Sequence, residues 1–411
     1  MQKPAIDAGA TERLHALDAV RAGALLLGVA FHATFPYLPG PQIWVVRDTP
    51  NNKLGMLFFV SHIFRMTTFF VIAGYFGRML RQRRGTGDFL RNRLTRIVVP
   101  FLVFWPVVTV AIAACKAWGA ATMSRGASPS IRTLLPPLSA KTIPLTHLWF
   151  LYVLSLFYAA TLILRGLAAL IDRSGRFRAG PVDRAMRLLL ATPAAAPLLA
   201  APLAIVLALQ PGWFALSGIP TPGTGLIPNP AAVIGFGTAF AFGWLLQRQR
   251  GLLVTIQRWW AIQLAAAIVF TMVCAWKFGS ARLFGPPPPF HVNLIYAACY
   301  ALAAWAWTLG LIGAALRYLA SERPAIRYVA DASYWIYLVH LPLVMALQIL
   351  LFPLHLPAIA KYALVTGIAS LLLLLSYEWL VRHSFMGQWL NGRKYPRARR
   401  ENPAAAAVAA E

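Results

Sequence analysis

The sequence predicts an all-α, polytopic membrane protein of about ten transmembrane helices with both termini in the cytoplasm. Of its 411 residues, 59% are hydrophobic and only 12% are charged, and the mean hydropathy is +0.62. A soluble chain of this size carries about twice that charged fraction. We therefore divide the chain into a cytoplasmic N-terminal segment (1–15), a transmembrane domain (16–382) and a cytoplasmic C-terminal tail (383–411).

Ten apolar stretches are each long enough to cross a bilayer core of about 30 Å at about 1.5 Å per residue. They cover residues 16–38, 54–80, 97–118, 147–171, 185–209, 230–247, 259–278, 292–316, 325–352 and 358–382. The fifth is interrupted by Pro193, Pro197 and Pro202, which membrane helices tolerate where neighbours satisfy the freed carbonyl groups. We see no internal repeat and expect no second, soluble domain.

The distribution of basic residues sets the expected orientation. The net charge is +26, and Lys and Arg are roughly three times as frequent in alternate loops when the N-terminus is placed inside. This topological pattern explains the charge, so we reject nucleic acid as a partner. The N-terminal segment has no cleavable apolar core, so we expect no signal peptide. Outer loops rich in Pro and Gly are expected to shape a substrate mouth, near residues 119–146, 210–229 and 279–291.

The first apolar stretch carries three ionisable side chains, which are costly inside a membrane and usually face a protein interior or a wet cavity. Asp18, Arg21 and His32 can line one face of a helix, because the eleven steps from Arg21 to His32 return to nearly the same direction. Ala24 and Gly28 lie between them on that face and leave room along it. We therefore expect a channel with a reaction site at His32 and an anchoring site about 16 Å away at Arg21.

The second stretch places His62 and Arg65 one turn apart, at a depth that matches His32. For His62 alone, a hydrogen bond between helices is an equally good interpretation. A buried arginine needs an anion. The carboxylates within the spans are all expected towards the inner side, namely Asp18, Asp331 and Glu378. The partner of Arg65 is therefore expected to be a ligand.

Two arginines stand one turn apart at the inner end of the third stretch. Arg93 and Arg96 offer forked donors that match phosphate geometry. The alternative is ordinary positive charge on the inner side, which explains most other arginines of this loop. We single out this pair as a candidate phosphate site.

Polar side chains also mark the fourth and ninth stretches. His147 opens the fourth at its outer end, where it either contacts a substrate or caps the helix. Ser333, Tyr337 and His340 follow at i, i+4 and i+7 in the ninth and form one polar stripe. Such a stripe either lines a cavity or makes hydrogen bonds between helices. Pro342 is expected to kink this helix.

Taken together, these motifs resemble the acyltransferase family 3 membrane proteins. Arg21 and His32 match that family's Arg-x10-His pattern, and Arg93-Leu94-Thr95-Arg96 matches its Arg-x-x-Arg motif. The segments FFVIAGY, HLWFL and SYWIYLVHLPL resemble further landmarks, and two of them are most similar to the subgroup called glucan biosynthesis protein C. The resemblance covers most of the spans but is weakest from 172 to 291. Ala73 stands where the family usually has Ser.

The resemblance implies an acyltransferase of the bacterial inner membrane that moves an acyl group from cytoplasmic acyl-CoA to hydroxyls of an extracytoplasmic glycan. It implies succinyl transfer to osmoregulated periplasmic glucan, with acetyl transfer to another surface polysaccharide as the alternative. A glycan or small-molecule transporter and a non-catalytic envelope protein remain rival hypotheses. Membrane lipid is an expected partner; acyl-CoA is a co-substrate, and we expect neither a permanently bound cofactor nor a metal.

Three sets of site residues follow from the motifs and the resemblance. His32, Arg21 and Asp18 form the catalytic set, in which His32 acts as general base or carries the acyl group transiently. Arg93, Arg96, Arg65 and Tyr75 form the acyl-CoA-binding set, and Arg65 is also expected to pair with the free carboxylate of a succinyl group. The substrate-lining set is His62, His147, Ser333, Tyr337 and His340.

Overall fold

The computed structural model describes residues 8–39, 44–123, 138–172, 180–213, 218–278, 289–392 and 395–396, which contain helices and no β-strand. The α-helices are α1 (Ala8–Ala33), α2 (Asn52–Arg93), α3 (Val99–Met123), α5 (Trp149–Ile171), α7 (Pro181–Ala191), α8 (Ala195–Ala208), α9 (Pro230–Leu246), α10 (Leu253–Arg258), α11 (Trp260–Phe278), α12 (Phe290–Tyr318), α13 (Pro324–Leu351), α14 (Ala358–Ser376) and α15 (Phe385–Asn391). Shorter 3-10 and π turns are η1 (Phe35–Tyr37), η2 (Leu94–Val98), η3 (Thr146–Leu148), η5 (Gln247–Leu252) and η7 (Tyr377–Arg382). Each of the ten predicted stretches coincides with a helix or a bent helix pair.

The number of membrane crossings differs from the number of apolar stretches. By length and composition, seven helical ranges of the described chain are able to cross a membrane, or eight if the bent pair α7 and α8 is one span. One of the seven, Asn52–Met123, holds 72 residues and therefore two predicted stretches. At about 1.5 Å per residue it is far longer than a bilayer core. The chain is thus a multi-pass membrane protein, while the count of ten remains a prediction.

Proline accounts for the bent pair. Helices α7 and α8 meet at 105°, and the break between them contains Pro193. Proline lacks a backbone N–H and its ring clashes with the preceding turn, so a helix ends there unless neighbours compensate. Pro342 behaves differently, because α13 continues through it.

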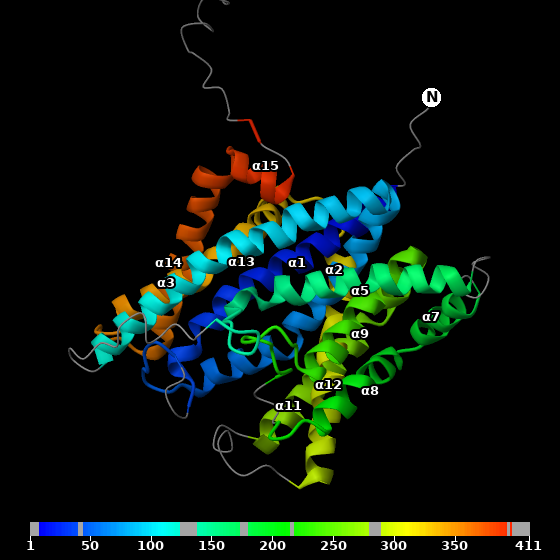
Figure 1. Cartoon of the computed structure of the whole chain (residues 1–411). Helices are drawn as coiled ribbons and strands as arrows, with labels where there is room; N and C mark the ends of the chain where they lie inside the picture. Colours follow the sequence, from blue (N-terminus) through cyan, green and yellow to red (C-terminus); the bar gives the residue numbers. More distant parts are fainter. Residues whose placement is uncertain are drawn as a thin grey trace, which may run out of the picture.

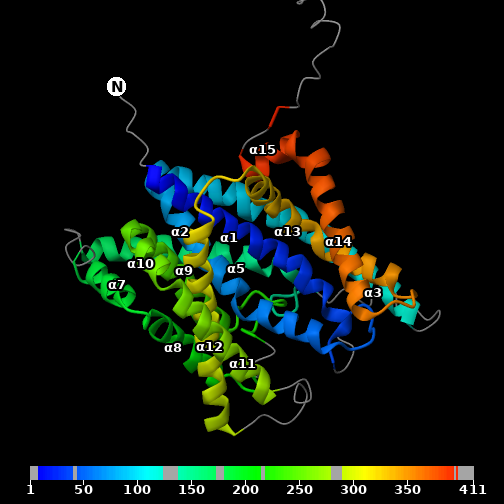
Figure 2. The same ribbon diagram turned by 180° about the vertical axis from the view of Figure 1, so that it is seen from behind.

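Helix α1 lies at the centre of one half of the bundle and packs against α13, α12 and α2 (Figures 1 and 2). Helices α3 and α14 flank it on one side. The other half contains α8, α9 and α11, which pack together through α12 and α2. The start of α1 and helix α15 lie at the same end of the bundle in both views, consistent with termini that share one side of the membrane.

Glycine allows α2 and α9 to touch backbone to backbone. A Cβ atom on Gly74 would overlap the carbonyl oxygen of Phe240, and one on Gly243 would overlap that of Val71. Small residues at such positions permit the close helix contacts that stabilise membrane bundles. Gly74, in the FFVIAGY segment, therefore serves helix packing.

Candidate active site

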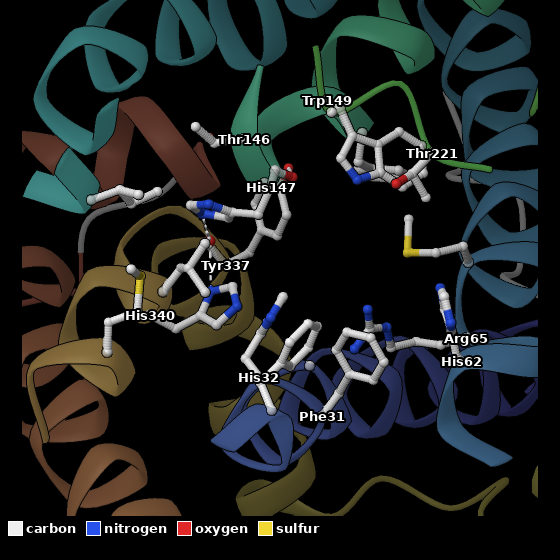
Figure 3. A pocket seen from close by; sticks show the side chains of 18 of the residues that line it. Phe31, His32, His62, Arg65, Thr146, His147, Trp149, Thr221, Tyr337 and His340 are labelled. Carbon is white, nitrogen blue, oxygen red and sulfur yellow. Dashed lines mark hydrogen bonds between the residues drawn. The ribbon is translucent and has the colours of Figure 1, made fainter. Parts of the chain in front are cut away.

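A cavity of about 510 Å³ lies between α1, α2, α3, α13 and the start of α5, at the end of the bundle opposite α15 (Figure 3). Its apolar wall includes Ala24, Gly28 and Phe31, so the cavity extends along α1 from His32 as far as Ala24. Its polar lining residues are His32, His62, Arg65, Lys116, Thr146, His147, Thr221, Thr224, Tyr337 and His340. The cavity therefore brings together around His32 five of the side chains that were expected at the site, namely His62, Arg65, His147, Tyr337 and His340.

His32 occupies the last turn of α1 and is held by contacts from distant parts of the chain. Its carbonyl oxygen accepts a hydrogen bond of 3.0 Å from Nε2 of Gln348, whose Oε1 accepts one of 2.6 Å from the indole of Trp44. The imidazole also stacks on the rings of Phe35 and Trp44. The ring nitrogen Nδ1 is buried and has no hydrogen-bond partner among the described residues. The backbone and one face of His32 are thus fixed, while its nitrogens remain available.

Arg65 is a buried cation without a carboxylate. Only 8% of the residue is exposed, and its guanidinium lies 4.1 Å from the ring centroid of Phe31. None of the ion pairs within the described ranges includes Arg65, and its Nη1 atom has no hydrogen-bond partner there. A cation–π contact offsets part of the desolvation of a guanidinium, but an isolated buried charge still favours an anionic partner. The expectation that a ligand supplies this anion is consistent with the geometry.

Tyr337 joins two further histidines. Its carbonyl oxygen accepts hydrogen bonds from Nδ1 of His340 at 2.9 Å and from Nε2 of His147 at 3.1 Å. Its hydroxyl donates in return to the carbonyl oxygen of His147 at 2.8 Å. The ring centroid of His340 lies 5.2 Å from that of His32 and 5.0 Å from that of His147. Three imidazoles therefore form a row across the cavity (Figure 3).

Two of the expected outer loops contribute to the cavity wall. The segment before α5 provides Pro144 and Thr146, and the segment before α9 provides Thr224, which forms an isolated β-bridge with Pro144. Gly218, in the left-handed region at φ +67°, presses its backbone against the ring of His62, where a Cβ atom would overlap. The third loop, near 279–291, lies largely outside the described residues.

A buried ion pair ties down the segment that carries Trp44. Nζ of Lys361 donates to Oδ2 of Asp48 at 2.8 Å and to the carbonyl oxygen of Phe352 at 2.9 Å. The two charged side chains are only 7% and 11% exposed. This segment thereby holds Trp44 against His32.

The structure places Asp18 and Arg21 away from the cavity, although they were grouped with His32. The two side chains pair with each other at 3.0 Å and line a separate hollow with Arg323, Arg327 and Asp331, among others. Eleven helical residues separate Arg21 from His32, which is too far for contact. Arg21 thus lies one channel length from His32, as the spacing predicts, and its anchoring role stays a prediction.

Three other expected site residues also lie outside the cavity lining. The hydroxyl of Ser333 donates to the carbonyl oxygen of Ala330 in its own helix, and the residue is 3% exposed. Tyr75 is buried among core residues. Nη1 of Arg93 donates to the hydroxyl of Tyr158 at 3.3 Å and stacks on the same ring.

Arg96 lies at the inner end of the bundle beside helix α15. Its side chain contacts Gly392, where a Cβ atom would overlap the guanidinium, and its carbonyl oxygen accepts a 2.6 Å bond from Tyr334. The π-helical turn η2 follows Arg93, and such turns often occur at functional sites. Arg93 and Arg96 therefore share one end of the molecule, and neither lines the histidine cavity.

Three residues near His32 were not anticipated. Lys116 lines the cavity, Trp44 stacks on His32, and Gln348 bonds its carbonyl. A lone lysine within an apolar stretch is a signal that the sequence did offer for Lys116. Trp44 and Gln348 left no such signal, because their significance depends on contacts 12 and 316 residues away.

The described residues contain no group of three or more His, Cys, Asp or Glu side chains arranged to hold a metal ion. The cysteines Cys115, Cys274 and Cys299 are free thiols within helices, and the first two are buried.

A family model described as "Acyltransferase domain" matches residues 14–378, which is most of the chain. The chain belongs to this acyltransferase family. Its curated relatives include the glucans biosynthesis proteins C of Shigella dysenteriae serotype 1 (strain Sd197) and Salmonella paratyphi B, each 36% identical over 100 or 99 residues. The matched segment spans about a quarter of this chain and about a quarter of those relatives. No solved structure matches the chain.

The description of the family names the transfer of acyl groups. The family match covers the helices that build the histidine cavity, from α1 to α14. Acyl transfer to a hydroxyl needs a group that removes the hydroxyl proton, and a histidine is the side chain that most often does so. The acyltransferase activity and the histidine cavity therefore agree with one another.

Proposed function

We propose that this acyltransferase moves a succinyl group from cytoplasmic acyl-CoA to a hydroxyl of an extracytoplasmic glycan, in the bacterial inner membrane. The observation that carries the proposal is the buried, unpaired guanidinium of Arg65 in the same cavity as His32. A succinyl group has a free carboxylate at the end distant from its thioester. That carboxylate supplies the anion that Arg65 lacks.

His32 acts as the general base in this proposal. It removes the proton of the glycan hydroxyl as the oxygen attacks the thioester carbonyl carbon. The carbon–sulfur bond then breaks, and the proton passes from His32 to the departing CoA thiolate. The products are the glycan ester and free CoA, so atoms and charges balance without an oxidant, reductant or metal.

The two substrates approach from opposite ends. The phosphates of CoA bind near Arg93 and Arg96, at the end of the bundle that carries α15, where forked guanidinium donors suit phosphate oxygens. The glycan enters through the other end, where Thr146 and Thr221 from two outer loops line the cavity. The names of the curated relatives favour a periplasmic glucan as the acceptor.

The His32→Ala variant tests this proposal. We expect the purified variant, assayed with succinyl-CoA and periplasmic glucan, to lose at least about 100-fold in the rate of CoA release, because general-base catalysis contributes about 10²–10⁴-fold. Mass spectrometry of the glucan should show the loss of succinyl substituents. The variant should still accumulate in the membrane at the wild-type level. Unchanged acylation by this variant would remove His32 from the mechanism.

A further inference from the structure

We propose that His340 is a positioning residue for His32, forming with it a histidine dyad that sets which nitrogen of His32 acts as base. The inference rests on the proposed function of His32. It begins with the row of imidazoles that Tyr337 organises across the cavity (Figure 3).

The hydrogen bonds to Tyr337 determine the tautomer of His340. A carbonyl oxygen only accepts hydrogen bonds, so Nδ1 of His340, at 2.9 Å from the Tyr337 oxygen, must carry the proton. The same atom also lies 3.2 Å from the carbonyl oxygen of Ile336. A neutral His340 therefore presents an unprotonated Nε2, which is a hydrogen-bond acceptor. By the same reasoning His147, which donates from Nε2, retains an acceptor at Nδ1.

The backbone of α13 holds one side of the His340 ring. Pro342 has no N–H to donate to the carbonyl group of Leu338 in the preceding turn. The carbonyl group of Tyr337, one residue before Leu338, accepts from His340 of the same helix and from His147. The position of Nδ1 of His340 is thereby fixed by its own helix.

Two neighbouring rings each have a buried nitrogen atom without a partner. Nε2 of His340 and Nδ1 of His32 are both buried and unbonded within the described chain, and His340 is only 5% exposed. The ring centroids are 5.2 Å apart at an interplanar angle of 43°. An unmade buried hydrogen bond is costly, and a rotation of the His32 ring lets its Nδ1–H donate to Nε2 of His340. Catalytic hydrogen bonds often tighten in this way only when substrate is bound.

The dyad supplies what other catalytic histidines obtain from a carboxylate. Among the described residues that line the cavity, none is Asp or Glu. In general, a base histidine needs a third group that accepts the proton of its other nitrogen and so fixes its tautomer. With Nδ1–H donated to His340, Nε2 of His32 is the atom that takes the proton of the glycan hydroxyl. His340 then also stabilises the imidazolium that forms, without itself losing or gaining a proton.

Variants of His340 separate this role from binding and from packing. We expect His340→Leu to lower kcat by about 10- to 100-fold. This is the effect of removing a partner that orients a histidine in metal sites, and His340 has the corresponding role towards His32. KM for succinyl-CoA should stay within about twofold. His340→Gln, whose Oε1 restores an acceptor near the former Nε2 position, should recover much of the lost kcat. A merely structural role would not distinguish Leu from Gln in this manner.

Controls make each outcome decisive. Trp335→Phe, on the same helix but bonded to Ser376 away from the cavity, should keep wild-type kcat. Wild-type kcat in His340→Leu, with an inactive His32→Ala, would overturn the dyad while leaving the proposed function intact. Equal losses in the Leu and Gln variants, or a rise of more than about twofold in KM for succinyl-CoA, would also overturn it. An active His32→Ala variant would instead overturn the proposed function itself.

Discussion

At the scale of single residues, the candidate site is defined by ionisable side chains whose burial within apolar spans is costly. Arg65 and His32 lie in spans of apolar sequence, and both retain nitrogen atoms without partners among the described residues. An unsatisfied polar group in such surroundings costs about 1–3 kcal/mol or more. That cost is offset when a ligand occupies the cavity, which is why these two side chains carry the functional proposal.

The role of Arg65 predicts donor specificity. In Arg65→Gln we expect kcat/KM for succinyl-CoA to fall by about 10- to 100-fold, because a hydrogen bond to a charged group contributes about 1.5–3 kcal/mol. With acetyl-CoA, which has no free carboxylate, the change should be within about threefold. Arg65→Lys keeps the charge but not the fork and should lie between wild type and Arg65→Gln for succinyl-CoA. The measurement is CoA release with each donor. An equal fall with both donors would show that Arg65 does not read the carboxylate.

Sequence reasoning identified six residues of the cavity, whereas four other candidate site residues lie outside its lining, namely Asp18, Arg21, Tyr75 and Ser333. His32, His62 and Arg65 were recovered because ionisable residues are rare in spans and helical geometry sets their depth. Ser333 shares a helical face with Tyr337, but its hydroxyl bonds its own helix, which periodicity alone does not reveal. Arg21 shares a face with His32, but it lines a separate hollow with the segment that follows α12 and with the start of α13.

At the scale of helices, a proline marks where one predicted span bends, and glycines mark where two helices touch. Pro193 separates α7 from α8, as its position within an apolar stretch suggested. The pairing of α2 with α9 was not predictable, because a glycine in a sequence does not indicate which helix approaches it. Gly74 and Gly243 meet across that interface although they are far apart in the chain.

The α2–α9 contact predicts a stability difference between two glycine substitutions. In Gly243→Ala the new methyl group would overlap the carbonyl oxygen of Val71, so we expect a loss of about 1–3 kcal/mol in the free energy of unfolding. Gly367→Ala on α14 is the matched control, since a Cβ atom there meets nothing within 4 Å. It should be neutral or gain up to about 1 kcal/mol in helix stability. Thermal melts in detergent compare the two variants. Equal melting temperatures would mean that α2 and α9 are not in backbone contact.

At the scale of the whole molecule, the two ends of the bundle differ in chemistry. One end carries α15, the start of α1, and the arginines Arg93 and Arg96. The other carries the histidine cavity and the two outer loops that line it. In the proposed function, a donor with phosphates and an acceptor with hydroxyls would therefore approach from opposite sides of the membrane. This separation gives the enzyme a reason to span a bilayer at all.

The excess of Lys and Arg in alternate loops assigns the arginine end to the cytoplasm, and single cysteines test that assignment. In a chain whose three native cysteines are replaced by Ala, Leu138→Cys lies in an exposed loop at the cavity end and Ser321→Cys lies between α12 and α13. On spheroplasts, whose inner membrane is intact, we expect a membrane-impermeant maleimide to label the cysteine at position 138. The cysteine at position 321 should be labelled only after lysis. The reverse pattern would place the arginines outside, where no acyl-CoA is made, and would separate the donor from its proposed site. Retained acylation activity in the cysteine-free chain is the control, because it shows that the labelled protein keeps its native orientation.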